Sequence, residues 1–453
     1  LAAAQANPAL AKAIKPFQYV GKADLLVEFT PSKNQDEVVG YAARLMPKGG
    51  QLLWDQLPYR MDTLTGEVLV QPERITLRDL KATHGKATLA VGGKVDLSAL
   101  RTQATLAVKS STPVDEDLLK VMTFLESPFD GNLQAGGTIT TDLTQLQLTW
   151  DHATKTEPAK FAWTTDGRIG LADAQYKIDL ADKEAHKLTG ELLGHLGRRN
   201  DLFTAHADAA LTTFQVEHIP LKEIRGELRC TERDRNVLQI QKLTARCQTG
   251  KLAGNVSVHL DGETEYEFDL SMVDVPLAAT LTTEASRKLM KGSLQGRLAM
   301  HYKTGKKRIR QAEGHLEIVR GELYRLPVYL DTLSVLALQL PGKSAFQSGH
   351  IRYTLRDDTL NLREIFLTGK SISLLGSGTI SLKTDALELS FLTGPPGKLP
   401  RIDQVSTEIL RALSKQLMEI RVTGTTAKPK FQPRPLGRIT TILETLLAPL
   451  KAR

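Results

Sequence analysis

Apolar and polar residues alternate along most of this chain. In Ile351–Leu355, Val256–Leu260 and Leu387–Phe391, every second residue is apolar. Period two places alternate side chains on opposite faces of a sheet, and the frequent Thr, Val and Ile favour strands. Turn-forming pairs such as Asp261-Gly262 and Asp166-Gly167 recur between these runs. The pattern predicts many antiparallel strands, each apolar on one face and polar on the other.

Helical spacing is confined to a few stretches. Residues 437–451 place six Ile and Leu residues on one stripe, which predicts an amphipathic helix in the C-terminal segment 436–453. Residues 403–420 carry a similar stripe. Shorter helices are expected at 114–126 and 278–291.

Three segments of 23 residues, 75–97, 238–260 and 360–382, align without a gap. Apolar residues coincide at their first, third, sixth, fifteenth, twenty-first and last positions. Like-patterned strands cannot bury their apolar face within one unit, so they either fold onto a second sheet or stack into an open structure. Aromatic residues make up only 5% of the chain, which favours a long aliphatic lining over one dense core.

The expected fold is therefore mostly β: an elongated, curled antiparallel sheet of repeating units that forms an apolar groove, with a few short helices. We divide the chain into residues 1–220, the first part of the repeating sheet, residues 221–435, its C-terminal part, and the helix at 436–453.

The region from about 290 to 435 resembles the C-terminal part of the AsmA-like family, which includes proteins of the TamB and YhdP type. Gly314-His-Leu-Glu-Ile-Val-Arg-Gly321 with the following Leu326-Pro327 is similar to the family's glycine-bracketed hairpin. The strands at Asp358–Leu362, Gly376–Leu382 and Leu387–Leu389 follow in the family's order. Val422–Phe431 resembles the segment that closes such domains.

The resemblance implies a bridge-like lipid-transfer protein that conducts phospholipids between the inner and outer membranes of a Gram-negative-type envelope. It implies a periplasmic location and a tether to the inner membrane, which we expect upstream of Leu1. The implied partners are phospholipid acyl chains and a membrane surface. The alternative is a periplasmic scaffold or assembly factor that binds outer-membrane proteins through exposed strand edges.

The apolar positions of the C-terminal strands are the candidate groove lining. Read differently, they are the buried core of a sandwich. They are Ile351, Tyr353, Leu355, Leu360, Leu362, Ile372, Leu374, Ile380, Leu382, Leu387 and Leu389.

The formal net charge of +8 is concentrated locally. Residues 301–325 hold seven Lys and Arg against three Asp and Glu. This run predicts either a solvated hairpin tip or contact with anionic lipid headgroups through Lys303, Lys306, Lys307, Arg308 and Arg310. Aromatic residues do not interleave with the basic positions, so nucleic acid is not an expected partner.

Candidate chemistry adds little to this picture. The ten His residues lack metal-ligand spacing, and the Gly-rich segments are followed by strands rather than by the helix that a phosphate loop requires. No nucleophile motif is present, so the sequence predicts no enzyme, no cofactor and no metal. Cys230 and Cys247 leave open both a single disulfide bridge and two buried thiols.

Overall fold

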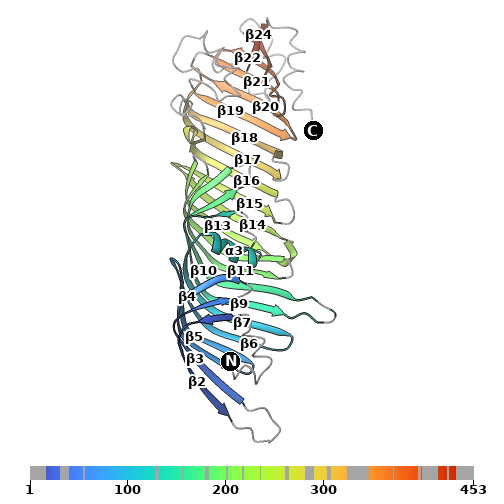
Figure 1. Ribbon diagram of the computed structural model, residues 1–453. Coiled ribbons are helices and arrows are strands. Elements are labelled where there is room, and N and C mark those ends of the chain that lie inside the picture. Colours follow the sequence, from blue (N-terminus) through green and yellow to red (C-terminus); the bar gives the residue numbers. More distant parts are fainter. Residues whose placement is uncertain are drawn as a thin grey trace. The chain divides into compact units, whose positions relative to one another are not determined.

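The computed structural model describes residues 17–30, 40–54, 57–127, 132–154, 156, 158–178, 183–199, 202–216, 219–234, 236–260, 265–280, 290–303, 308–323, 346–370, 372–395, 399, 417–425 and 428–434. Within these residues the chain is mostly β, with 24 strands in one long antiparallel meander sheet and a single α-helix (Figure 1). The prediction of a mostly β, antiparallel sheet is confirmed.

Contacts divide the chain into two compact units, residues 1–217 with 224–240, and residues 218–223 with 241–453. The first twelve strands, all in the first unit, are β1 (Phe17–Val20), β2 (Ala23–Thr30), β3 (Gly40–Trp54), β4 (Leu57–Gln71), β5 (Arg74–His84), β6 (Ala87–Leu97), β7 (Arg101–Pro113), β8 (Leu133–Gln134), β9 (Thr138–Asp151), β10 (Lys160–Ile178), β11 (Lys183–Arg199) and β12 (Leu202–Val216). Residues of both units contribute to β13 (Ile219–Cys230) and β14 (Val237–Cys247).

The remaining strands belong to the second unit. They are β15 (Gly250–His259), β16 (Glu265–Pro276), β17 (Met290–Lys303), β18 (Arg308–Leu323), β19 (Ser348–Arg356), β20 (Thr359–Thr368), β21 (Ser373–Ser381), β22 (Leu387–Gly394), β23 (Met418–Gly424) and β24 (Pro429–Arg434). The described helical elements are α3 (Glu116–Phe124) and the 3-10 turns η1 (Glu232–Asp234) and η2 (Leu277–Thr280).

Each of the three sequence repeats covers two successive strands joined by a short turn. Residues 75–97 cover β5 and β6, residues 238–260 cover β14 and β15, and residues 360–382 cover β20 and β21. The repeated unit is thus a two-stranded hairpin.

The repeated apolar positions also mark a β-bulge in the first strand of the hairpin. In β5 the register shifts between Leu77 and Leu80, and in β20 it shifts between Leu362 and Ile365. A bulge inserts one extra residue, so the apolar spacing of two becomes a spacing of three. The coincidence of apolar residues at the first, third and sixth positions of the repeat is explained by this shift.

The second strand of the hairpin, β6 or β21, carries a glycine near the bulge of the first strand. Gly93 has φ +142° and Gly378 has φ +149°. A Cβ atom at these positions would collide with the carbonyl oxygen of Thr105 or of Glu388 on the next strand. Only glycine adopts this backbone readily, and together with the bulges it bends the strands.

The predicted helix at 114–126 is confirmed as α3. The Asp115 carboxylate caps it by accepting a hydrogen bond of 2.9 Å from the Leu118 backbone N–H. Of the predicted helix at 278–291, residues 278–280 lie in η2, residues 290–291 lie in β17, and the rest lies outside the described residues.

Two local expectations were wrong. Residues 418–420, the end of the predicted helix at 403–420, form the start of β23, because Ile420 pairs with Phe391 of β22. The pair Asp166-Gly167, read as a turn, lies inside β10 at a register shift against β9. The rest of the helix at 403–420 and the C-terminal helix at 436–453 lie outside the described residues.

Candidate functional site

Cross-strand register gathers the apolar residues of the second unit on one face of its sheet. Residues paired across antiparallel strands point to the same side. The pairing Tyr353–Leu362–Gly378–Leu389–Val422 links five strands in this way. The apolar face of the second unit includes Leu252, Val256, Tyr266, Phe268, Leu270, Met272, Val275, Leu294, Leu298, Met300, Tyr302, Ala312, Leu316, Ile318, Ile351, Tyr353, Leu355, Leu360, Leu362, Ile365, Leu367, Leu374, Ile380, Leu387, Leu389, Phe391, Ile420 and Val422.

The first unit has an apolar face of its own, built in the same way. Leu106 of β7 pairs with Leu146 of β9, and Ile169 of β10 pairs with Leu192 of β11. This face includes Ile75, Leu77, Leu80, Ala82, Leu89, Val91, Val95, Ala104, Leu106, Val108, Leu143, Leu146, Leu148, Trp150, Phe161, Trp163, Ile169, Leu171, Leu192, Leu196, Phe203, Ala205, Ala207, Ala209 and Leu211.

The two apolar faces differ in how far they are covered. In the first unit, Leu106, Leu146, Ile169 and Leu192 are half-buried, whereas Val108, Leu143 and Leu196 on the same face are buried. In the second unit, burial rises toward the C-terminus, from the half-buried Leu270 of β16 to strands β20–β23, where residues such as Leu389 and Ile420 are fully buried. The apolar face of the first unit therefore leaves aliphatic surface partly open to solvent, whereas strands β20–β23 pack into a closed core.

The predicted lining residues come together in this region. Leu362, Leu374, Ile380, Leu387 and Leu389 are buried members of one hydrophobic cluster. Ile351, Tyr353, Leu360 and Ile372 are partly buried and pack against it. Leu355 is buried where it pairs with Ala312 and Leu360. Leu382 lies in the turn after β21 with 40% of its surface exposed.

Several residues of the same cluster were missed by the sequence reasoning. They include Ile365, Leu367, Phe391, Ile420 and Val422, all fully buried. Strict alternation from Leu360 and Leu362 would place Glu364, not Ile365, on the apolar face. The signal for the bulge was present, since the apolar positions of the aligned repeats are spaced by two and then by three.

The opposite face of the sheet carries cross-strand ion pairs. In the second unit the Arg297 guanidinium donates two hydrogen bonds of 2.7 Å to Asp269, which lower the pKa of that carboxyl group. In the first unit, Arg74 lies 2.6 Å from Asp96, and Lys109 lies 3.2 Å from Asp142. Each unit therefore has one aliphatic face and one face with cross-strand ion pairs, which we call the charged face. In the second unit, this charged face also contains the buried pair Leu375 and Leu392.

A buried charged cluster lies on the charged face of the second unit. The His350 ring lies between two carboxylates, with Nδ1 3.2 Å from Glu317 and Nε2 3.3 Å from Glu364. The Glu364 side chain is fully buried, and Arg352 Nε also lies 3.3 Å from it. Buried charges are retained in proteins when they are paired in this way, so the arrangement is explained as structural.

The predicted headgroup contacts are only partly described. Lys303 Nζ donates a hydrogen bond of 2.5 Å to Glu265, on the charged face at the end of β17. Lys306 and Lys307 lie outside the described residues. Arg308 and Arg310 lie in β18, where the structure describes their backbone only.

Other chemistry is sparse in the described part of the chain. It contains no group of three or more His, Cys, Asp or Glu arranged to hold a metal ion. None of its helices combines the length and apolar character needed to cross a membrane. Cys230 and Cys247 form no disulfide within the described residues; each is 1% exposed, and burial raises the pKa of Cys247.

Comparison of the chain with family models, curated proteins and solved structures finds no match.

Proposed function

We propose that this protein binds phospholipid acyl chains on the apolar face of its sheet and conducts them between the two membranes of a Gram-negative-type envelope. The observation that carries the proposal is the half-buried aliphatic face of the first unit, which the register extends from β5 to β12. Each methylene removed from water contributes about 0.8 kcal/mol, so a single acyl chain has ample driving force to bind there.

The character of the two faces supports the same proposal. Acyl chains need an apolar surface without specific polar groups, and a conduit must release what it binds. The charged face, with its ion pairs such as Arg101–Asp151 and Arg78–Glu67, keeps the other side of the sheet in water. The proposed activity is transfer without covalent chemistry. The resemblance to AsmA-like proteins in residues 290–435 points in the same direction.

Two adjacent leucines of β11 provide a matched test. Leu192 lies on the apolar face and is half-buried, whereas Leu193 points to the charged face and is 47% exposed. We expect purified protein to carry phospholipid that mass spectrometry identifies. We expect Leu192→Asp to reduce that lipid strongly, and Leu193→Asp to leave it unchanged, with both variants folded by circular dichroism. Equal lipid content in the two folded variants, or none in the wild type, would contradict the proposal.

A second function, assembly of outer-membrane proteins through a strand edge, is favoured by one observation. Strand β2 pairs with β3, and no other strand pairs with it in the described register. Leu25 and Leu26, which point to opposite faces of β2, are 61% and 48% exposed. Natural edge strands usually carry lysine or proline that prevents pairing, and Ala23–Thr30 contains neither. Here Leu26→Lys would abolish binding of an unfolded outer-membrane protein and leave lipid content unchanged.

A further inference from the structure

Helix α3 connects the two opposite rims of the sheet in the first unit. One rim contains the β5–β6 turn at His84 and the ends of β7 and β9 at Pro113 and Thr138. The other rim contains the C-terminal ends of β9 and β11, close to Phe161 and Arg198. The strap, as we call residues 115–126, contacts groups at both rims.

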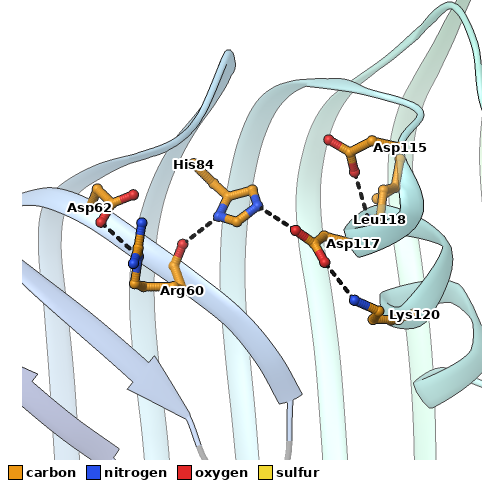
Figure 2. A network of polar contacts seen from close by, with 7 residues as sticks. All are labelled: Arg60, Asp62, His84, Asp115, Asp117, Leu118 and Lys120. Carbon is orange, nitrogen blue, oxygen red and sulfur yellow. Dashed lines mark hydrogen bonds and ion pairs between the residues drawn. The ribbon is translucent and has the colours of Figure 1, made fainter.

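The first contact fixes the N-terminal end of the strap to the rim at His84 (Figure 2). The His84 ring has Nδ1 2.6 Å from the Arg60 carbonyl oxygen and Nε2 3.1 Å from the Asp117 carboxylate. Both neighbours are hydrogen-bond acceptors, so the ring nitrogen that carries the proton can donate to the acceptor beside it. Asp117 also accepts a hydrogen bond of 2.8 Å from Lys120.

The second contact fixes the C-terminal end of the strap to the opposite rim. The Trp163 indole Nε1–H donates a hydrogen bond of 2.7 Å to the Leu125 carbonyl oxygen. The Arg198 guanidinium lies 3.0 Å from the Glu126 carbonyl oxygen and 2.9 Å from its carboxylate. Both Trp163 and Arg198 extend from the apolar face, on which Trp163 pairs with Arg198 across β10 and β11.

Strand β10 runs from one rim to the other and is interrupted by a register shift against β9. The register shift at Asp166 and Gly167, where Gly167 has φ +145°, lies midway along β10.

Polar contacts at both ends and partial burial of its apolar side chains hold the strap. No residue of α3 is fully buried; Leu118, Val121 and Phe124 are half-buried, and the helix lies against β4. The ring contact between Phe124 and Phe161, with centroids 5.6 Å apart, supplements the polar contacts at the C-terminal end. A helix of this length is not stable alone in water. Loss of the contacts at either rim should therefore release it, because elements with few buried contacts open first.

We propose that the strap is a movable closure over the apolar face of the first unit, and that its release controls the entry of acyl chains. The inference rests on the proposed function, since it assumes that this face binds lipid. Closed, the strap joins the two rims above the apolar residues. Open, it exposes the face to a membrane or to a bound lipid.

Variants at each rim test whether these contacts, which we call the latch, hold the strap against the sheet. We expect Asp117→Ala and Arg198→Met each to speed amide hydrogen exchange in residues 116–124 about tenfold or more, as loss of a charged hydrogen bond predicts. Lys120→Met is the matched control, because Lys120 contacts the same carboxylate but not the sheet. Unchanged exchange in both latch variants, or an equal increase in the control, would overturn the latch.

A cross-linked protein tests whether the closure controls entry. His84→Cys with Asp117→Cys can be joined by a short bis-maleimide, while Cys230 and Cys247, each 1% exposed, stay unreactive. The probe is a fluorescent phosphatidylethanolamine in vesicles of phosphatidylethanolamine and phosphatidylglycerol. We expect faster uptake by Asp117→Ala than by the wild type, and slower uptake after cross-linking. Equal uptake in all three would overturn the closure while leaving lipid binding intact. If none of the three proteins takes up the probe, both the proposed lipid binding and the closure are overturned. The hydrogen-exchange experiment still tests whether the latch holds the strap.

Discussion

Truncating one leucine on each apolar face should cost very different amounts of stability. Leu389 of β22 is fully buried among Leu362, Ile380 and Val422, whereas Leu106 of β7 is half-buried. Leu→Ala removes three carbon groups, which is about 2.4 kcal/mol of transfer free energy at full burial. The cavity raises this to between about 3 and 4 kcal/mol for Leu389→Ala. For Leu106→Ala we expect about 1 kcal/mol, because less area leaves water and no closed cavity forms.

A chain with two compact units does not unfold in a single step, so a local measurement is required. Hydrogen exchange followed by mass spectrometry reports the opening free energy of each segment. We expect exchange in β21–β23 to become at least about a hundredfold faster in Leu389→Ala, and exchange in β6–β9 to become about fivefold faster in Leu106→Ala. If Leu106→Ala were as costly as Leu389→Ala, the face of the first unit would be closed, and the argument that lipid can reach it would fail.

Two further predictions concern the charged face and the bent strands. A hydrogen bond from Lys303, followed by one from His301, lowers the pKa of Glu265 from 4.5 to about 2, so its stabilisation is complete above pH 4.5 and is lost as the pH falls toward 2. After solvent screening this amounts to about 1 kcal/mol, and thermal unfolding of Glu265→Gln should show a lower melting temperature at pH 7 and a smaller loss between pH 4.5 and 2 than the wild type. Gly378→Ala should destabilise the second unit by between about 1 and 3 kcal/mol because of its backbone at φ +149°. Gly85→Ala, in the open β5–β6 turn, should cost less stability. Urea denaturation measures both losses, and equal values would refute the steric argument.

Local pattern was sufficient to predict the strands and the hairpin repeat, because the extended backbone that pairs in a sheet also places successive side chains on opposite faces. It was also sufficient for α3, where Asp115 caps a short apolar period. Alternation failed where one residue too many entered a strand. Asp166-Gly167 has the composition of a turn, but β10 continues through it, opposite an extra residue in β9.

Burial could not be predicted in the same way. Leu106 and Leu389 occupy equivalent positions in alternating strands, and nothing near either residue shows that one is half-buried and the other enclosed. Coverage depends on which distant segments approach a face, so it is a tertiary property. The contacts of the strap illustrate the same limit, since His84 and Asp117 are 33 residues apart and Arg198 and Glu126 are 72 apart.

The two-stranded repeat has a consequence for how such a chain changes length in evolution. Duplicating one hairpin adds an even number of strands, so the chain re-enters the sheet in its original direction with its apolar residues on the original face. Each duplication would widen the sheet by two interstrand spacings, roughly 10 Å. Loss or gain of a single strand would reverse every later strand. Homologous chains should therefore differ in length by whole hairpins. Each added hairpin should carry a copy of the bulge, recognisable by apolar positions spaced by two and then by three residues.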